Sequence, residues 1–260
     1  MDLTTTDVCP ICHGEEWIPI RIDGIDYMKP CECRERALME RRLKFANLPD
    51  AFRGMKLNSF STDVYRKRDS KVLIATACRT VKCYLDNFED MREAGMGLYL
   101  YSKTKGSGKT RMVAGIANEL MKRYPVRFAG STTILKEIKR SWNCEKQKRW
   151  DQDELMSESQ LLDELSRVEI LIIDDFGTES AADWINDKFY QIINDRYVNG
   201  KVTIFTSNES LDNLKYDDRI TNRIKERTYQ IAFPEESVRD YIAEKNKKDM
   251  IERLVKDGNA

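Results

Sequence analysis

The stretch from Tyr101 to Thr110 reads YSKTKGSGKT and decides the fold. It follows a short apolar run, Gly97–Tyr101, and it opens a helical pattern. A phosphate-binding loop needs glycines where backbone N–H groups turn toward an anion, a lysine for the outer phosphates and a hydroxyl for Mg²⁺. The residues that supply this pattern are Gly106, Ser107, Gly108, Lys109 and Thr110. The sequence therefore predicts a nucleotide site between a strand and a helix.

One position departs from the usual phosphate loop. Lys103 stands where the pattern has its first glycine, so its side chain either alters how the loop closes or adds a charge over the phosphates. An ordinary glycine-rich turn between a strand and a helix is the alternative explanation of the stretch.

Acidic and amide side chains follow two further apolar strands. LIIDDFG at 171–177 carries Asp174 and Asp175 at the end of a buried strand, and Asn208 follows the strand expected at 202–206. We expect Asp174 to hold Mg²⁺ through water and Asp175 to polarise the attacking water. The Asn208 amide can both donate and accept, which suits a contact with the γ-phosphate or its water. Alternatively, the two aspartates cap the following turn.

Strands and helices alternate from residue 70 onward. The expected strands are 97–101, 126–129, 169–174, 202–206 and 229–233. The expected helices are 70–93, 109–123, 181–198, 218–226 and 236–255, with more helical sequence up to about 165. This alternation predicts an α/β fold, a parallel sheet flanked by helices that binds its ligand at the carboxyl ends of the strands.

Three arginines follow these motifs. Arg219 and Arg223 are four residues apart in DRITNRI at 218–224, so on a helix they share a face, and Arg239 lies in ESVRDYI at 236–242. Guanidinium groups stabilise charge on a transferring phosphoryl group, and a neighbouring subunit can supply one in trans.

In this order of motifs, residues 70–245 resemble the AAA+ ATPases of the DnaC/DnaI helicase-loader and IstB-like group. The resemblance implies the AAA+ (P-loop NTPase) fold, ATP and Mg²⁺ as cofactors, and ATP hydrolysis. It implies that Asn208 is the sensor 1 residue, Arg223 the arginine finger with Arg219 beside it, and Arg239 the sensor 2 arginine. It also implies self-association through the ATPase domain and, as partners, a replicative DnaB-type helicase and single-stranded DNA.

Four of the seven cysteines form two short pairs near the N-terminus, Cys9-Pro-Ile-Cys12 and Cys31-Glu-Cys33. Two such pairs can close a tetrahedral thiolate site, so we expect zinc to hold together a small module. His13 could replace one thiolate, an iron–sulfur cluster is a poorer fit, and reduced, unliganded thiols are the remaining alternative. The resemblance implies that this N-terminal domain grips the helicase.

The chain is expected to divide into a zinc-binding, helicase-interacting module at 1–45, a linker at 46–69 and the AAA+ domain at 70–260. Forty-four basic and forty-four acidic residues balance, so there is no global field toward nucleic acid or membrane. The purest apolar stretch, at 170–173, is four residues long, and no export signal opens the chain. We therefore expect no membrane segment and a cytoplasmic location, in a bacterial cell or a phage-infected host.

The stretch 136–150, KEIKRSWNCEKQKRW, is basic and contains two tryptophans. Its positive charge and indole rings predict a contact with single-stranded DNA. An equally weighted hypothesis is a solvated helix in which Trp142 and Trp150 are buried.

The function expected from these features is ATP-dependent loading of a replicative helicase onto single-stranded DNA. The alternatives are an IstB-like transposition ATPase, which the cysteine module disfavours, and a nucleotide-binding adaptor that does not hydrolyse ATP.

Overall fold

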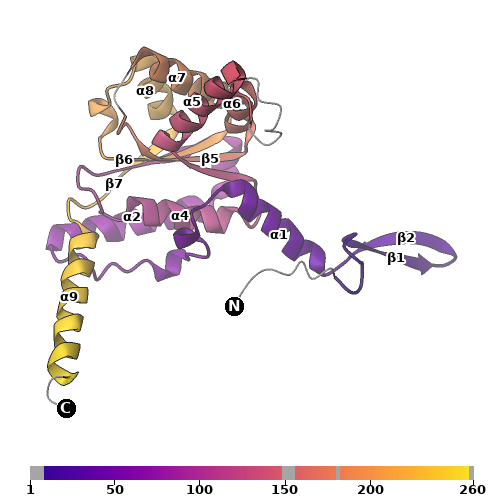
Figure 1. Cartoon of the computed structure of the whole chain (residues 1–260), viewed down its shortest axis with the longest axis horizontal. Coiled ribbons are helices and arrows are strands. Elements are labelled where there is room, and N and C mark those ends of the chain that lie inside the picture. The colour runs from indigo at the N-terminus through magenta and orange to yellow at the C-terminus, as the bar shows by residue number, and fades with distance from the viewer. Residues whose placement is uncertain (1–8, 148–155, 180–181, 258–260) are drawn as a thin grey trace.

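A five-stranded parallel sheet forms the centre of the computed structural model, which describes residues 9–147, 156–179 and 182–257 (Figure 1). Its strands are β3 (Gly97–Tyr101), β4 (Val126–Gly130), β5 (Ile170–Phe176), β6 (Val202–Ser207) and β7 (Thr228–Ala232). They stand in the order β4-β5-β6-β3-β7, and each neighbouring pair is parallel. The predicted α/β fold is confirmed, and all five strands lie close to their expected positions.

Helices cover both faces of the sheet (Figure 1). One face carries α2 (Arg68–Asp86) and α4 (Lys109–Leu120), and the other carries α5 (Ser131–Gln147), α6 (Glu158–Arg167), α7 (Asp183–Val198) and α8 (Asp218–Glu226). The single helix expected at 70–93 is divided at Asn87 into α2 and α3 (Phe88–Glu93). The last helix, α9 (Val238–Asp257), extends away from the sheet. Within the described ranges, no helix combines the length and the apolar character that a membrane crossing requires.

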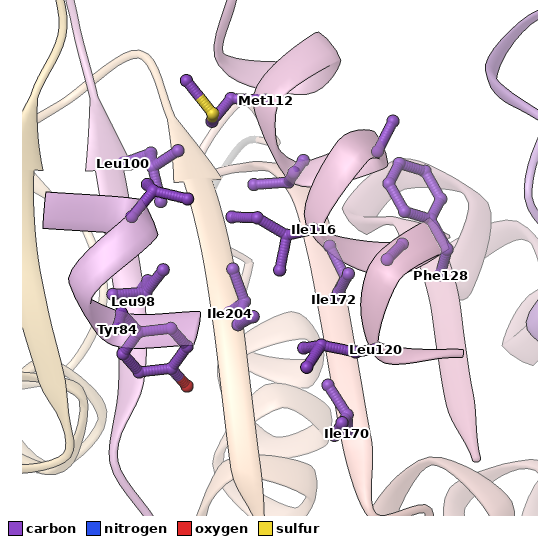
Figure 2. Packing of buried hydrophobic residues seen from close by; sticks show 14 of the residues in the cluster. Tyr84, Leu98, Leu100, Met112, Ile116, Leu120, Phe128, Ile170, Ile172 and Ile204 are labelled. Atoms are coloured by element: carbon purple, nitrogen blue, oxygen red, sulfur yellow. The ribbon is translucent and has the colours of Figure 1, made fainter. Parts of the chain in front are cut away.

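Alternating side chains connect the sheet to both helix layers. Leu98 and Leu100 of β3 pack with Ile116 and Leu120 of α4 on one face (Figure 2). Tyr99, between them in sequence, belongs to the cluster on the opposite face. Successive residues of a strand point to opposite faces, so a short, wholly apolar strand is buried on both sides.

The N-terminal part contains an antiparallel hairpin of β1 (Trp17–Ile22) and β2 (Ile25–Pro30), followed by α1 (Cys33–Ala46). The hairpin stands away from the sheet at one end of the molecule (Figure 1). It was not among the expected elements, although Asp23-Gly24 is a strong two-residue hairpin signal. Both turn residues have positive φ, +49° at Asp23 and +80° at Gly24, as that turn requires.

The segment expected as a linker, 46–69, packs into the core of the sheet domain. Leu48 and Tyr65 are buried in the same cluster as α2 and α4, and the segment also forms two short 3-10 turns, Asp50–Phe52 and Leu57–Ser59. Just before it, Arg42 of α1 donates to the carbonyls of Met121 and Arg123, 3.2 and 3.1 Å away. A cation at the exposed carbonyls after a helix is favourable, so this contact anchors α1 at the end of α4.

Arg196 of α7 is a buried cation, only 1% exposed. Its guanidinium donates to the carbonyls of Leu165, Val168 and Val202 at 2.8, 2.8 and 2.6 Å, and to Thr203 Oγ1 at 2.9 Å. Burial lowers its pKa to about 9. These carbonyls lie near the end of α6 and at the start of β6, so a single side chain holds the entry to two neighbouring strands.

We predict that Arg196→Met lowers the free energy of unfolding by about 3 kcal/mol, because several buried carbonyls lose their donors. Urea unfolding followed by circular dichroism measures the change. Arg167→Met is the matched control, since the Arg167 side chain is 81% exposed and forms a surface salt bridge with Asp163. An Arg196→Met protein as stable as the wild type would contradict this role.

Candidate functional site

The phosphate loop, the two aspartates and Asn208 lie at one edge of the sheet. The loop follows β3, Asp174 and Asp175 are near the end of β5, and Asn208 follows β6. Because β6 lies between β5 and β3, the carboxyl ends of three adjacent strands deliver these groups to one place.

The backbone angles of the loop favour glycine at two positions, and at Gly108 the space does so as well. Gly106 has φ +80° and Gly108 has φ +97°. A Cβ on Gly106 would lie 3.0 Å from Arg239 Cγ, and one on Gly108 would lie 2.8 Å from Tyr65 Oη. Lys103 has no positive φ and its side chain is exposed, so the backbone here accommodates a residue other than glycine.

Lys109 extends through the loop to Asn208. Its Nζ donates to Asn208 Oδ1 at 3.2 Å, to the carbonyls of Ser102 and Thr104 at 3.1 and 3.3 Å, and to Ser107 Oγ at 3.3 Å. Burial lowers the pKa of Lys109, although nearby carboxylates oppose the shift. The ammonium is therefore fixed by neutral oxygens inside a loop built to surround an anion, and this arrangement fits the phosphates of a nucleotide.

Asp174 meets two hydroxyls. Thr110 Oγ1 donates to its carboxylate oxygens at 3.0 and 3.2 Å, and Thr206 Oγ1 donates at 2.6 Å. Burial raises the pKa of Asp174, and the nearby charge of Asp175 adds to this. A hydroxyl and a carboxylate in contact are hard oxygen ligands, so the pair fits Mg²⁺.

Asp175 has an exposed side chain and a strained backbone. Its φ is +55°, and it lies where the register between β5 and β6 shifts. Its N–H donates to Thr206 Oγ1 at 2.9 Å, and its carbonyl accepts from Ser131 Oγ at 2.9 Å. These contacts hold an uncommon conformation that leaves the carboxylate exposed beside the loop.

Arg239 is brought to the phosphate loop, together with a carboxylate that the sequence did not single out. Glu235 accepts from the N–H groups of Lys103 and Thr104 at 2.9 and 2.8 Å, and the Val238 N–H donates to Gly106 O at 2.9 Å. Burial opposes ionisation of Glu235, but these hydrogen bonds prevail and lower its pKa. The start of α9 is thereby fastened to the loop.

Arg219 and Arg223 contact groups of α7 and α8 rather than the loop of their own chain. Arg219 forms a paired contact with Asp217, at 3.1 and 3.0 Å. Arg223 donates from Nε to Asn194 Oδ1 at 3.1 Å. Any contact that they make with a nucleotide therefore involves another molecule or a rearrangement of the chain.

The four N-terminal cysteines converge, with their sulfur atoms within 4.8 Å of one another. Cys9 and Cys31 Sγ are 3.7 Å apart, and Cys12 and Cys33 Sγ are 3.3 Å apart. Tetrahedral zinc with Zn–S bonds of about 2.3 Å needs sulfur separations of roughly 3.8 Å, so the donor set fits this metal. The contact with Cys12 raises the pKa of Cys33, because adjacent thiols resist ionising together without a cation. His13 is exposed and lies outside the group.

The basic stretch 136–150 falls only partly within the described residues. Trp142, on α5, is half-buried, its ring centroid lies 5.2 Å from that of Trp184, and its Nε1 donates to the Glu158 carboxylate. This indole is engaged in packing, as the second interpretation of the stretch expected. Residues 148–150, including Trp150, and the side chains of 143–147 lie outside the description.

The chain is similar in sequence to several known proteins. No protein-family model matches the chain. The phage-like element PBSX protein XkdC of Bacillus subtilis is 24% identical over 226 residues, covering 84% of this chain and 78% of XkdC. The replicative helicase loader DnaI of the same organism is 36% identical over 124 residues, which are 47% of this chain and 36% of DnaI.

The fold of the chain is also similar to that of several solved structures. A DnaI crystal structure superposes with a TM-score of 0.54 at 26% identity, covering 75% of this chain and 97% of that one. The DnaC helicase loader gives a TM-score of 0.56 at 22% identity, with 72% and 100% covered. The initiator DnaA bound to AMPPCP and single-stranded DNA gives 0.55 at 18%, with 76% and 55% covered.

The resemblance to the DnaC/DnaI group of AAA+ proteins is confirmed. Two further aromatic residues contact the loop, and neither was among the residues that the sequence predicted. Tyr65, wholly buried, donates from Oη to the Ser107 carbonyl at 2.7 Å, and the Phe60 ring would lie 3.3 Å from a Cβ on Gly108. No local signal marks them, because both belong to the stretch expected as a linker and reach the loop only in the folded chain.

The raised pKa of Asp174 predicts an effect on the stability of the protein without nucleotide. A carboxyl whose pKa is higher in the folded state stabilises the fold below its unfolded pKa and loses this contribution as the pH rises through its folded value. Asp174→Asn, which is neutral and similar in shape, should therefore raise the free energy of unfolding at pH 8 and have a smaller effect at pH 5.

Urea unfolding without nucleotide or magnesium measures this difference. Asp212→Asn, at a carboxylate that is 75% exposed, is the control and should bring no such gain. A less stable Asp174→Asn protein at pH 8 would show that the hydrogen bonds from Thr110 and Thr206 outweigh burial.

Proposed function

We propose that this chain is an ATP-dependent loader of a replicative DnaB-type helicase onto single-stranded DNA. The observation that carries the proposal is the contact of Lys109 with Asn208 beside that of Thr110 with Asp174. Together they combine a phosphate cradle, a magnesium-binding pair and a polar group for the terminal phosphate. Similarity to DnaI supports the loader role.

In this proposal, the N–H groups of Gly106 to Thr110 and the Lys109 ammonium bind the ATP phosphates, while Thr110 and Asp174 hold Mg²⁺. The metal neutralises charge on the phosphates. Asp175, exposed beside the loop, orients and polarises the attacking water, and Asn208 fixes the water or the γ-phosphate. Arg239, whose side chain packs over Gly106, senses the bound nucleotide from the start of α9.

Arg219 and Arg223 act in trans, on ATP held by a neighbouring copy of the chain. Their partners lie on α7 and α8, and those of Arg239 lie at the loop, so the two kinds of arginine serve different sites. Self-association through residues 70–260 then completes each site. Residues 1–45 hold zinc and grip the helicase, and 46–69 joins the two parts.

Lys109→Ala should lower ATP turnover by at least about 100-fold, because the only loop ammonium directed into the cradle is lost. Phosphate release with and without single-stranded DNA measures it, and Lys105→Ala, which removes an exposed lysine of the same loop, is the control. Turnover that Lys109→Ala leaves unchanged would refute the enzyme proposal, and tight ATP binding without turnover in the wild type would favour the adaptor.

The loader role is tested on the same proteins by measuring helicase bound to closed circular single-stranded DNA. The wild type should raise that amount in the presence of ATP, and Lys109→Ala should not. A chain that neither co-purifies with the helicase nor loads it would exclude the loader role while leaving ATP hydrolysis in place.

We predict about one zinc ion per chain in the purified full-length protein, lost in Cys33→Ser, because three thiolates bind less tightly than four. Elemental analysis measures the metal, and Cys83→Ser, at an exposed cysteine outside the cluster, is the control. Helicase co-purification should fall with the zinc, while ATP turnover persists. Iron in place of zinc, or four free thiols in the native protein, would overturn the assignment.

A further inference from the structure

We propose that Tyr190 and Asn194 of α7 are positioning residues for Arg223, holding its guanidinium ready for the phosphates of a neighbouring copy. This inference rests on the proposed function, in which the arginine acts in trans. Neither α7 residue belongs to a motif of the sequence, and both are half-buried against α8.

Aromatic rings and guanidinium groups alternate along the contact of α7 with α8. The Cζ atoms of Arg219 and Arg223 lie 4.8 and 5.1 Å from the centroid of Tyr190. Arg223 is also 5.6 Å from the centroid of Tyr197, which Arg227 approaches at 5.0 Å. The face of an aromatic ring attracts a cation, so two rings hold a row of three like charges together.

The spacing of these residues in the sequence produces the alternation of rings and guanidinium groups. Tyr190, Asn194 and Tyr197 are separated by four and three residues, so they share one face of α7. Arg219 and Arg223 are four apart and share the facing side of α8. The two faces meet because α7 and α8 pack against each other, and both helices contribute buried side chains to the same apolar cluster.

The two arginines differ in how their charge is compensated. Arg219 forms a salt bridge with Asp217, the residue that also caps α8. In the described part of the chain, no carboxylate lies within salt-bridge distance of Arg223. Its partners are neutral, namely Asn194 Oδ1 at 3.1 Å, Arg219 O at 2.7 Å and Tyr190 Oη at 3.5 Å.

Neutral partners fix the direction of a guanidinium without cancelling its charge. A long arginine side chain otherwise samples many rotamers. The Tyr190 ring and the Asn194 amide restrict these rotamers, so less conformational entropy is lost when the guanidinium binds a phosphate. Arg223 is thus preorganised, partly exposed and not neutralised by a carboxylate of the described residues, while Arg219 must first leave Asp217.

The first test uses charge and shape at the two positions. Tyr190→Leu should lower kcat for ATP about tenfold with little change in KM, while Tyr190→Phe, which keeps the ring, should turn over like the wild type. Asn194→Asp preserves the shape of the side chain and places a carboxylate against Arg223 Nε, so it should also lower kcat about tenfold. Tyr229→Leu, at a 45% exposed tyrosine on β7, is the matched control.

The second test is complementation by mixing. Lys109→Ala protein has a dead loop and intact arginines, and Tyr190→Leu protein has the reverse, so the mixture should hydrolyse ATP several-fold faster than the sum of the two alone. A merely structural defect in Tyr190→Leu would not be restored by mixing, and that result would overturn the inference.

A readout without nucleotide separates this inference from the proposed function. The Arg223 Nε–H resonance of ¹⁵N-arginine-labelled free protein should be shifted by the aromatic rings. Tyr190→Phe should retain this shift, and Tyr190→Leu should lose the part that the Tyr190 ring contributes. An unchanged resonance in Tyr190→Leu, or wild-type kcat in both Tyr190→Leu and Asn194→Asp, overturns the positioning role. Wild-type turnover in Arg223→Ala instead overturns the trans arginine, whatever the resonance shows.

Discussion

The Lys109 ammonium is withdrawn from water, and among the residues that the structure describes it forms no salt bridge. The rest of the site is arranged around that constraint. Only 5% of the residue is exposed, and its hydrogen-bond partners are two carbonyls, a hydroxyl and the Asn208 amide. Burial of a cation is costly unless its hydrogen bonds are satisfied. The parallel sheet provides these hydrogen bonds. The adjacent strands β3 and β6 end at the same edge, so that Ser102, after β3, and Asn208, after β6, both reach the ammonium.

The chain buries a second cation for a different purpose. Arg196 of α7 is surrounded by backbone carbonyls between α6, α7 and the start of β6. Each nitrogen of its guanidinium donates to one of these carbonyls or to Thr203. Its acceptors lie at the end of α6 and at the start of β6, and the residue is almost wholly buried, so this cation holds structure. Lys109 instead lies at the carboxyl edge of the sheet, in a loop whose glycines Gly106 and Gly108 have positive φ. Geometry around the charge, more than burial itself, therefore separates a structural cation from a binding one.

Local pattern was enough to predict the sheet but not the full site. Strand positions and the phosphate loop follow from short apolar runs and glycine spacing, which a chain shows before it folds. Tyr65 and Glu235 could not be found this way, since they reach the loop from 42 and 132 residues away. Trp142 was undecided for the same reason, because only the fold places Trp184 beside it. The hairpin is the opposite case, since Asp23-Gly24 was legible in the sequence and was passed over.

The phosphate loop is contacted by segments that precede it and follow it in the chain. Tyr65 touches it from the segment that leads to the cysteine cluster, and Glu235 touches it from the start of α9. Glu236 joins these two segments directly, accepting from the N–H groups of Arg66 and Lys67 at 2.7 and 3.3 Å. A movement of the loop would therefore act on the buried Tyr65 or on the start of α9. Since Tyr65 is fully buried and packed among core residues, the exposed α9 is the element with room to respond, and the first turn of that helix is where Arg239 lies.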